Sequence, residues 1–115
     1  MKLPEEGKLL RIFIGEQDRW LGQPLHEAII HLAKKEGMAG ATAIKGFMGF
    51  GCKSRMHTAK ILRLSEDLPS IIEIVDTEEK ISAFLPRLDE MVQEGLITLE
   101  KAQVILYRAN PAGNA

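Results

Sequence analysis

Three short segments that are apolar on both faces constrain the fold of this chain more than any other feature. Residues 8–15, 71–75 and 104–107 each place large aliphatic or aromatic side chains at consecutive positions. A strand that faces water on one side alternates apolar with polar residues, whereas a strand buried on both faces does not. We therefore predict strands in these three segments and a sheet that needs a covering layer on each face.

Two amphipathic helices separate the predicted strands. The first begins at Pro24, follows the i, i+3, i+4, i+7 spacing of one apolar helical face, and ends at Gly37, which suits a left-handed cap. The second begins after Asp76 or Thr77, either of which can cap it, and ends at Gly95. Each helix thus has one face that must be buried against the sheet.

With a fourth strand at residues 41–50, the order of elements is β-α-β-β-α-β. This order predicts an α+β, ferredoxin-like fold, in which a four-stranded antiparallel sheet carries both helices on one face. A length of 115 residues fits one domain, with a core at about residues 8–108 and a long loop at about residues 49–69. Because two helices cover only one face, we expect another copy to cover the other; a monomer with a partly apolar sheet is the alternative.

Composition narrows the class of protein. Fifteen basic and sixteen acidic residues leave a net charge of −1, which argues against a nucleic-acid-binding module. The single cysteine, Cys52, cannot form an intrachain disulfide, and a reducing cytoplasm is the expected compartment. Pro4, Glu5 and Glu6 stand where a signal peptide would be apolar, and no run reaches the roughly 20 apolar residues that cross a bilayer. We therefore expect no direct membrane insertion.

Charge is segregated along the chain. Residues 37–65 contain five basic and no acidic residues, whereas residues 66–100 contain ten acidic and two basic residues. The basic block includes Gly46, Gly49 and Gly51. Backbone N–H groups of glycines can approach an anion closely, and basic side chains supply counter-charge, so this block is a candidate anion-binding loop. The alternative is a solvated connection whose glycines serve turns, since neither a Walker-type nor a Rossmann-type glycine motif occurs.

The side chains of this block offer charge but no complete catalytic or metal site. Lys45, Lys53 and Arg55 are the basic candidates for ligand binding, and His57 could contact a phosphate. Cys52 and His57 alone are too few to hold a soft metal, which needs three or four ligands, so no metal is predicted. No nucleophile stands in a recognisable arrangement with a base, so no catalytic residue is predicted.

Two apolar features have both a packing and a binding interpretation. Trp20, the only tryptophan, could stack on a ligand, but packing at a subunit contact is favoured. Met48 and Met56, beside Phe47 and Phe50, resemble an adaptable contact surface, although filling gaps in the core is the usual role of methionine. Composition leaves both interpretations open.

Several short motifs follow one another in a fixed order along the chain. They are Ala41-Thr42, Lys45-Gly46-Phe47, Gly49-Phe50-Gly51, His57, Leu64-Ser65-Glu66-Asp67-Leu68-Pro69 and Ile74-Val75-Asp76. With these motifs the chain resembles the small PII-like proteins catalogued as domain of unknown function 190 (UPF0166), which are related to nitrogen regulatory PII proteins. The resemblance extends from about Leu9 to Tyr107 in the order and spacing of the family.

The resemblance implies a PII-like ferredoxin fold, a homotrimer, and adenine nucleotides bound in the clefts between subunits. Lys45-Gly46-Phe47 matches the start of the long loop that contacts targets in PII proteins, and Leu68-Pro69 matches its end. Gly95 with Lys101 matches the loop before the last strand, which adds Lys101 to the candidates. The complete set of ligand-binding candidates is Lys45, Gly46, Gly49, Gly51, Lys53, Arg55, His57 and Lys101.

Together these features predict a trimeric ligand-binding and signalling module rather than an enzyme. An anionic small molecule or nucleotide would bind at the inter-subunit clefts, and a flexible loop would be presented to a membrane transporter or another regulated protein. Ser70, Thr98 and Glu100 stand where PII proteins have lysine or glycine, so a different anion is an alternative to an adenine nucleotide. A metal-tolerance-type or structural trimer without nucleotide binding, and a small phosphate-ester hydrolase, are two further hypotheses.

Overall fold

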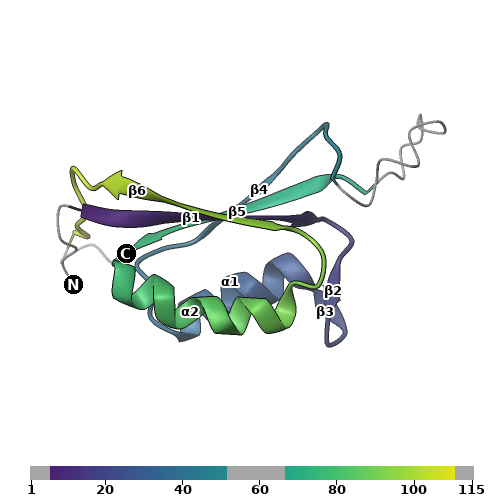
Figure 1. Ribbon diagram of the computed structural model, residues 1–115, viewed down its shortest axis with the longest axis horizontal. Helices are drawn as coiled ribbons and strands as arrows, with labels where there is room; N and C mark the ends of the chain where they lie inside the picture. The colour runs from purple at the N-terminus through teal and green to yellow at the C-terminus, as the bar shows by residue number, and fades with distance from the viewer. Residues whose placement is uncertain (1–5, 52–66, 111–115) are drawn as a thin grey trace.

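The fold is a four-stranded antiparallel sheet with two helices on one of its faces (Figure 1). The computed structural model describes residues 6–51 and 67–110. The sheet contains β1 (Glu6–Gly15), β4 (Thr42–Lys45), β5 (Pro69–Asp76) and β6 (Leu96–Gln103), in the order β4-β5-β1-β6. The remaining elements are the helices α1 (Leu25–Lys35) and α2 (Glu78–Met91) and a short hairpin of β2 (Arg19–Trp20) and β3 (Gln23–Pro24). The predicted ferredoxin-like α+β fold is confirmed.

β1 is a central strand, hydrogen-bonded to β5 on one side and to β6 on the other. Successive side chains of a strand point to opposite faces of its sheet. The side chains of β1 that are buried under the helices are Leu10, Ile12 and Ile14. Leu9, Arg11 and Phe13 therefore point to the opposite, uncovered face, which we call the open face.

The core lies between the sheet and the two helices. Each helix contributes one apolar face, as its sequence spacing predicts. The buried residues of the helices are Leu25, Ala28, Ile29 and Ala33 in α1 and Ile81, Phe84, Leu88 and Met91 in α2. Both predicted caps are confirmed: the Thr77 hydroxyl accepts a hydrogen bond from the Lys80 N–H (3.2 Å), and Gly37 follows α1 with a left-handed φ of 75°.

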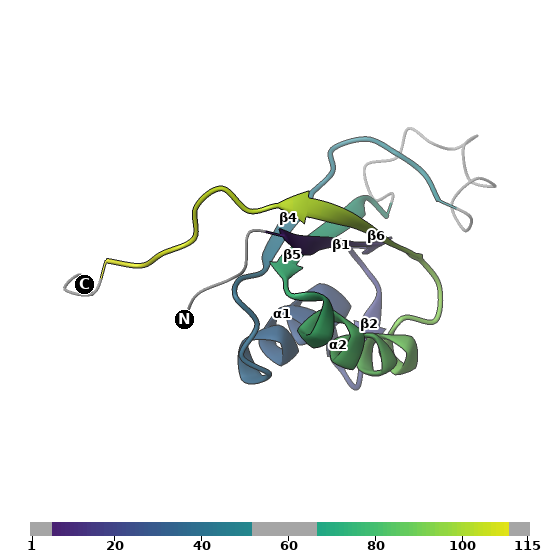
Figure 2. The same cartoon turned by 60° about the vertical axis from the view of Figure 1, so that its left-hand side comes forward.

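The last strand lies earlier in the chain than predicted. β6 covers Leu96–Gln103, whereas residues 104–107 lie outside the sheet. The prediction was wrong because Glu100 and Lys101 interrupt the apolar pattern of β6. Residues 104–107 are more apolar than the end of β6, so the sequence favours a strand there. In Figure 2, the yellow segment that follows β6 runs out from the body of the domain.

Two other elements are shorter than predicted. β4 ends at Lys45 instead of residue 50, because the chain leaves the sheet in the glycine-rich segment that follows. α2 ends at Met91 instead of Gly95. Gly95 belongs to the turn into β6, where a Cβ would lie only 2.6 Å from the Phe13 carbonyl oxygen, so glycine is needed for the close approach of two backbones.

No sequence pattern predicts the β2–β3 hairpin. Its loop consists of Leu21 (φ 48°) and Gly22 (φ 85°), both left-handed, as in the tight two-residue loops that join antiparallel strands. Glycine adopts this conformation readily, but leucine seldom does, so the sequence Leu21-Gly22 gives no clear signal of the turn. The hairpin holds Trp20, partly buried, against the core of its own chain. Its indole thus contributes to packing within one subunit.

Asp76, the last residue of β5, is a fully buried carboxylate. Its Oδ2 accepts a hydrogen bond from the Ala39 N–H (2.7 Å), and its Oδ1 accepts one from the Thr77 N–H (2.7 Å). The Tyr107 hydroxyl donates to the carbonyl oxygen of the same Ala39 (2.9 Å). These contacts hold the segment that leads from α1 into β4 against the end of β5.

We expect Asp76→Ala to lower the free energy of unfolding by about 2–3 kcal/mol, because two N–H groups lose their acceptor where water cannot readily replace it. Urea denaturation followed by circular dichroism measures this change. Asp89→Ala, which removes an exposed carboxylate from α2, is the control and should change stability by no more than about 0.5 kcal/mol. Equal losses in the two variants would contradict the role assigned to Asp76.

Candidate functional site

The candidate ligand-binding residues begin where β4 leaves the sheet. Lys45 is the last residue of β4, and the Gly46 N–H donates to the Pro69 carbonyl oxygen (2.8 Å). A Cβ at position 46 would lie 2.7 Å from the Pro69 Cγ, so only glycine fits against the proline ring. The two ends of the connection between β4 and β5 are thereby held side by side.

Two acidic side chains that sequence analysis missed lie where the two ends of this connection meet, which we call the base of the connection. The Glu16 Oε2 lies 3.3 Å from the Lys45 Nζ, and the Asp67 Oδ1 accepts a hydrogen bond from the Gln17 N–H (2.8 Å). The Glu16 N–H donates to the Leu68 carbonyl oxygen (2.8 Å). Gln17 and Asp67 are 50 positions apart, so no local pattern signals their contact. An anion that binds Lys45 would replace Glu16 as its partner.

Phe47, Met48 and Phe50 project into solvent directly after this base. Their exposed fractions are 89%, 79% and 80%. Of the two interpretations that the sequence left open, the structure excludes packing of these three side chains in the core of the isolated chain. Three neighbouring apolar side chains at this exposure are typical of a contact surface.

The remaining candidates of the basic block have different surroundings. Gly49 lies against the Pro69 ring, where a Cβ would come within 3.2 Å of Cγ. Lys53, Arg55, Met56 and His57 lie outside the described residues. The described part of the block therefore places Lys45 and two closely packed glycines, Gly46 and Gly49, at the base of the connection.

Lys101 lies within β6 and not in a loop before the last strand, because that strand begins at Leu96. Its register partner on β1 is Lys8. Lys45 is level with the other end of β1, near Ile14, through its pairing with β5. Strand geometry separates the two lysines by roughly 20 Å along the strands and about 14 Å across the sheet. One small ligand cannot contact Lys45 and Lys101 of the same chain.

The open face of the sheet is apolar at its two ends and charged in its middle. Its apolar residues are Leu9 and Phe13 of β1, Ile44 of β4, Ile71 and Val75 of β5, and Leu96 of β6. Ile44 and Leu96 are 43% and 56% exposed, and the other four are half-buried. No helix of the described residues covers this face (Figure 1).

Arg11 lies at the centre of the open face between two carboxylates. Its Nε donates to the Glu73 Oε2 (2.9 Å), and its NH1 group donates to the Glu100 Oε2 (2.7 Å). The hydrogen bond with Glu73 raises the pKa of Arg11 above its ordinary value, and the charge of Glu100 acts in the same direction. Arg11 is therefore cationic at neutral pH.

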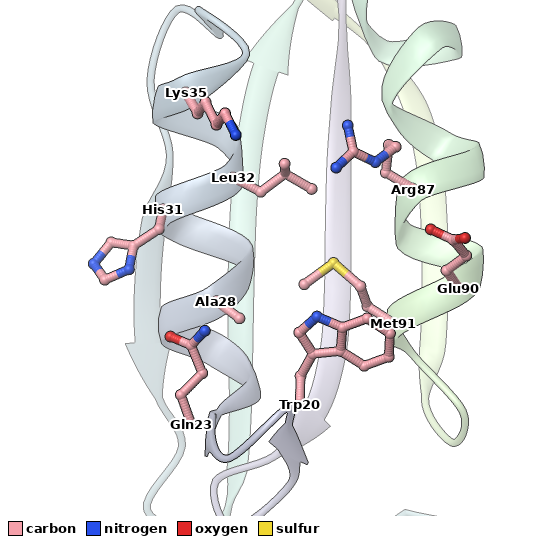
Figure 3. A pocket seen from close by; sticks show the side chains of 9 residues that line it. All are labelled: Trp20, Gln23, Ala28, His31, Leu32, Lys35, Arg87, Glu90 and Met91. Atoms are coloured by element: carbon pink, nitrogen blue, oxygen red, sulfur yellow. The ribbon is translucent and has the colours of Figure 1, made fainter.

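A separate hollow of about 230 Å³ lies between α1 and α2, next to the β2–β3 hairpin (Figure 3). Trp20 and Met91 form its apolar end, and Lys35 and Arg87 extend toward one another across it from opposite helices. Arg87 also donates to the Glu36 Oε2 (2.9 Å). None of the eight ligand-binding candidates lines this hollow, but Trp20, which could stack on a ligand according to its sequence context, does.

The described residues contain neither a cluster of metal-binding side chains nor a helix that could span a membrane. Within residues 6–51 and 67–110, no three histidine, cysteine, aspartate or glutamate side chains lie close enough together to hold a metal ion. Neither described helix has the length and apolar character that crossing a bilayer requires. Cys52 and His57, which the sequence offered as two ligands for a soft metal, lie outside these ranges.

Comparison with known proteins identifies the family. The family model DUF190, described as "Uncharacterized ACR, COG1993", matches residues 7–104. The chain belongs to the DUF190 family. UPF0166 proteins from Aquifex aeolicus and Methanocaldococcus jannaschii are each 39% identical to it, over 98 and 100 residues; the matches cover 85% and 86% of this chain and 92% of each relative. The resemblance drawn from the sequence motifs is thereby confirmed.

Solved structures share the fold of this DUF190 protein. A PII-like signalling protein from Thermus thermophilus matches with a TM-score of 0.60 at 20% identity, covering 87% of this chain and 90% of that one. CPII from Thiomonas intermedia K12, bound to ADP and bicarbonate, matches with a TM-score of 0.56 at 19% identity, covering 86% and 88%. At these identities the likeness establishes a PII-like fold.

We expect Gly46→Ala to lower the free energy of unfolding by roughly 1–3 kcal/mol, because the added methyl group meets both the ring and the carbonyl oxygen of Pro69. Gly40→Ala is the matched control, since a Cβ on Gly40 would meet none of the described residues within 4 Å. Thermal unfolding of both variants measures the difference. A neutral Gly46→Ala would mean that the glycine is not needed to hold the base of the connection.

Proposed function

We propose that this DUF190 protein is a PII-like ligand-binding and signalling module that acts as a homotrimer in the cytoplasm. The observation that carries the proposal is the uncovered open face, on which six apolar side chains surround the Arg11 charge pairs. A monomer rarely exposes an apolar patch of this kind. Three copies arranged around one axis would cover it, and kinship with PII proteins favours three.

The separation of Lys45 and Lys101 supports a ligand site between subunits. β4 and β6 are the two edges of the sheet, and contact between different edges of neighbouring copies forms a closed ring when the rotation from one copy to the next is one third of a turn. In such a ring, Lys45 of one subunit can approach Lys101 of the next, although the two lysines of one chain cannot meet. The proposed site lies in this cleft.

The proposed ligand is an anionic small molecule, with an adenine nucleotide as the first candidate. CPII, which shares the fold, binds ADP with bicarbonate, and in a second structure ADP with AMP and bicarbonate. The residues proposed to bind the ligand are Lys45, Gly46, Gly49, Gly51, Lys53, Arg55, His57 and Lys101. The Gly46 N–H is already used by Pro69, so its contribution is to hold Lys45 at the cleft.

The exposed Phe47, Met48 and Phe50 support a role in presenting a surface to a partner. They begin two residues after Lys45, so a ligand at Lys45 would change the surroundings of this apolar cluster. A membrane transporter or another regulated protein is the proposed kind of partner. Ligand-dependent contact with a partner needs no chemical step, and we propose no catalytic residue.

We expect Leu96→Glu to convert the trimer to monomers, because it places an unpaired charge on the open face, which the trimer removes from water. Light scattering coupled to size exclusion measures the mass. Leu21→Glu alters a leucine on the β2–β3 turn, far from the open face, and should leave the mass unchanged. A trimer that tolerates Leu96→Glu would show that another surface holds the subunits together.

A thermal-shift screen tests the proposed ligand. We expect an adenine nucleotide (ATP, ADP or AMP) to raise the melting temperature of the trimer by several degrees at saturating concentration. Lys45→Ala and Lys101→Ala should each reduce this shift, whereas Lys34→Ala on α1 should not. If each variant abolishes binding and the site lies between subunits, trimers reassembled from an equal mixture of the two variants should regain binding in about one cleft in four.

The outcomes of this screen separate the hypotheses. A shift with bicarbonate or phosphate, but with no nucleotide, would support the proposed cleft and show that its ligand is a simple anion. No shift with any nucleotide or simple anion would favour the hypothesis of a structural trimer. Loss of binding without recovery in the mixed trimers would place both lysines at one subunit's site and contradict the proposed geometry.

A further inference from the structure

The hollow between α1 and α2 combines an apolar floor with two cations at its far end. Trp20 and Met91 form one end of the floor, and Leu32 of α1 lies between them and the cations (Figure 3). Met91 is buried in the core, whereas Trp20 and Leu32 are only partly buried. A ligand that removes this remaining apolar surface from water gains free energy.

The β2–β3 hairpin holds Trp20 in place through a strained turn. Leu21 adopts a left-handed φ of 48°, which is unfavourable for leucine, and its side chain is 82% exposed, so burial does not offset the strain. The Arg19 side chain closes the turn by donating to the Gly22 carbonyl oxygen (2.6 Å). Backbone strain of this kind clusters at ligand sites and active sites. The indole is thus fixed at the hollow before a ligand binds.

Lys35 and Arg87, which face each other from opposite helices, make the far end of the hollow suitable for one negative charge. The Lys35 side chain forms no ion pair or hydrogen bond with another described residue. Arg87 donates through its NH1 group to Glu36 (2.9 Å), which leaves its other N–H donors for a ligand. Glu90 also lines the hollow and disfavours a second negative charge.

The volume of the hollow limits the size of the ligand. At about 230 Å³, it is smaller than the roughly 300–1,000 Å³ of sites for drug-sized ligands, and larger than a cavity of about 150 Å³ that holds one benzene molecule. A single ring with a short charged chain fits this space, whereas an adenine nucleotide is too large for it.

We propose that this hollow binds a small aromatic monocarboxylate. Its ring lies against the Trp20 indole and the Met91 thioether, both of which make favourable contacts with aromatic rings. Its carboxylate lies between Lys35 and Arg87 and accepts charge-assisted hydrogen bonds from both helices. The ligand therefore joins α1, α2 and the hairpin.

The hollow is distinct from the cleft proposed for the nucleotide. It lies between the helices, which cover one face of the sheet, whereas the open face is the other (Figure 1). All of its lining residues come from one chain, so binding does not require a trimer. The inference thus goes beyond the proposed function and gives the module a second effector of different chemistry.

Trp20 fluorescence tests the proposal, because Trp20 is the only tryptophan of the chain. Phenylacetate is titrated into the purified protein, with excitation at a wavelength that the probe does not absorb. We expect a saturable change in emission with a dissociation constant of about 1 mM or lower. Phenylacetamide, which has nearly the same shape but no charge, should bind at least about threefold more weakly. Acetate, which lacks the ring, should cause no saturable change.

Variants test the two cations. We expect Lys35→Gln and Arg87→Gln each to raise the dissociation constant of phenylacetate by about threefold to tenfold, and the double variant to raise it further. Lys34→Gln is the matched control, because Lys34 is the neighbouring lysine on α1 but does not line the hollow. It should leave the dissociation constant unchanged. Circular dichroism checks that each variant is folded.

Nitrogen–proton correlation NMR provides a second readout, since the single indole N–H resonance belongs to Trp20. Phenylacetate should shift this resonance even if the emission stays constant. The proposal would be overturned by the absence of both changes at several times the expected dissociation constant, by equal affinities for phenylacetate and phenylacetamide, or by unchanged affinity in the double variant. ATP, ADP and AMP should not compete with phenylacetate, so these outcomes leave the proposed nucleotide cleft intact.

Discussion

β1 carries apolar side chains on both faces, and the two helices cover only one of them. On the covered face, Leu10, Ile12 and Ile14 form the middle of the core. On the open face, Leu9 and Phe13 lie half-buried beside apolar residues of the neighbouring strands. Within one chain, such a sheet has its apolar side chains covered on one face and left partly exposed on the other. This uncovered second apolar surface is the reason for proposing that another copy of the chain packs against it.

The same sheet separates the functional elements along its edges. β4 leads into the connection that carries the basic block, and β6 carries Lys101 and is followed by the apolar segment 104–107. Because these strands are opposite edges, a single chain cannot combine them, whereas neighbouring copies in a ring can. Asp76 connects the two regions within a subunit, since the Ala39 peptide that it holds is also the anchor of Tyr107. The proposed assembly and the proposed ligand site thus share one framework.

The elements predicted correctly from the sequence are those with strong local patterns. The spacing of Leu25 to Ala33 predicts α1, Thr77 predicts the cap of α2, and the two-faced apolar strands predict the open face. β6 was misplaced because Glu100 and Lys101 interrupt its apolar pattern, although Glu100 is needed as a partner for Arg11. The base of the connection could not be predicted, since Glu16 and Asp67 acquire their roles only through contacts distant in sequence.

The charged centre of the open face has a different role from its apolar ends. The apolar ends favour association in any orientation, because burial of apolar area is not directional. Arg11, Glu73 and Glu100 would make association depend on orientation. Their hydrogen bonds are satisfied within one face, and a copy bound in a shifted position would remove water from one of these charges without providing another partner. In the proposed trimer, the charges would thus add little to affinity but would disfavour shifted arrangements of the subunits. In the proposed trimer, the apolar side chains drive association and the Arg11 cluster selects one arrangement of the copies.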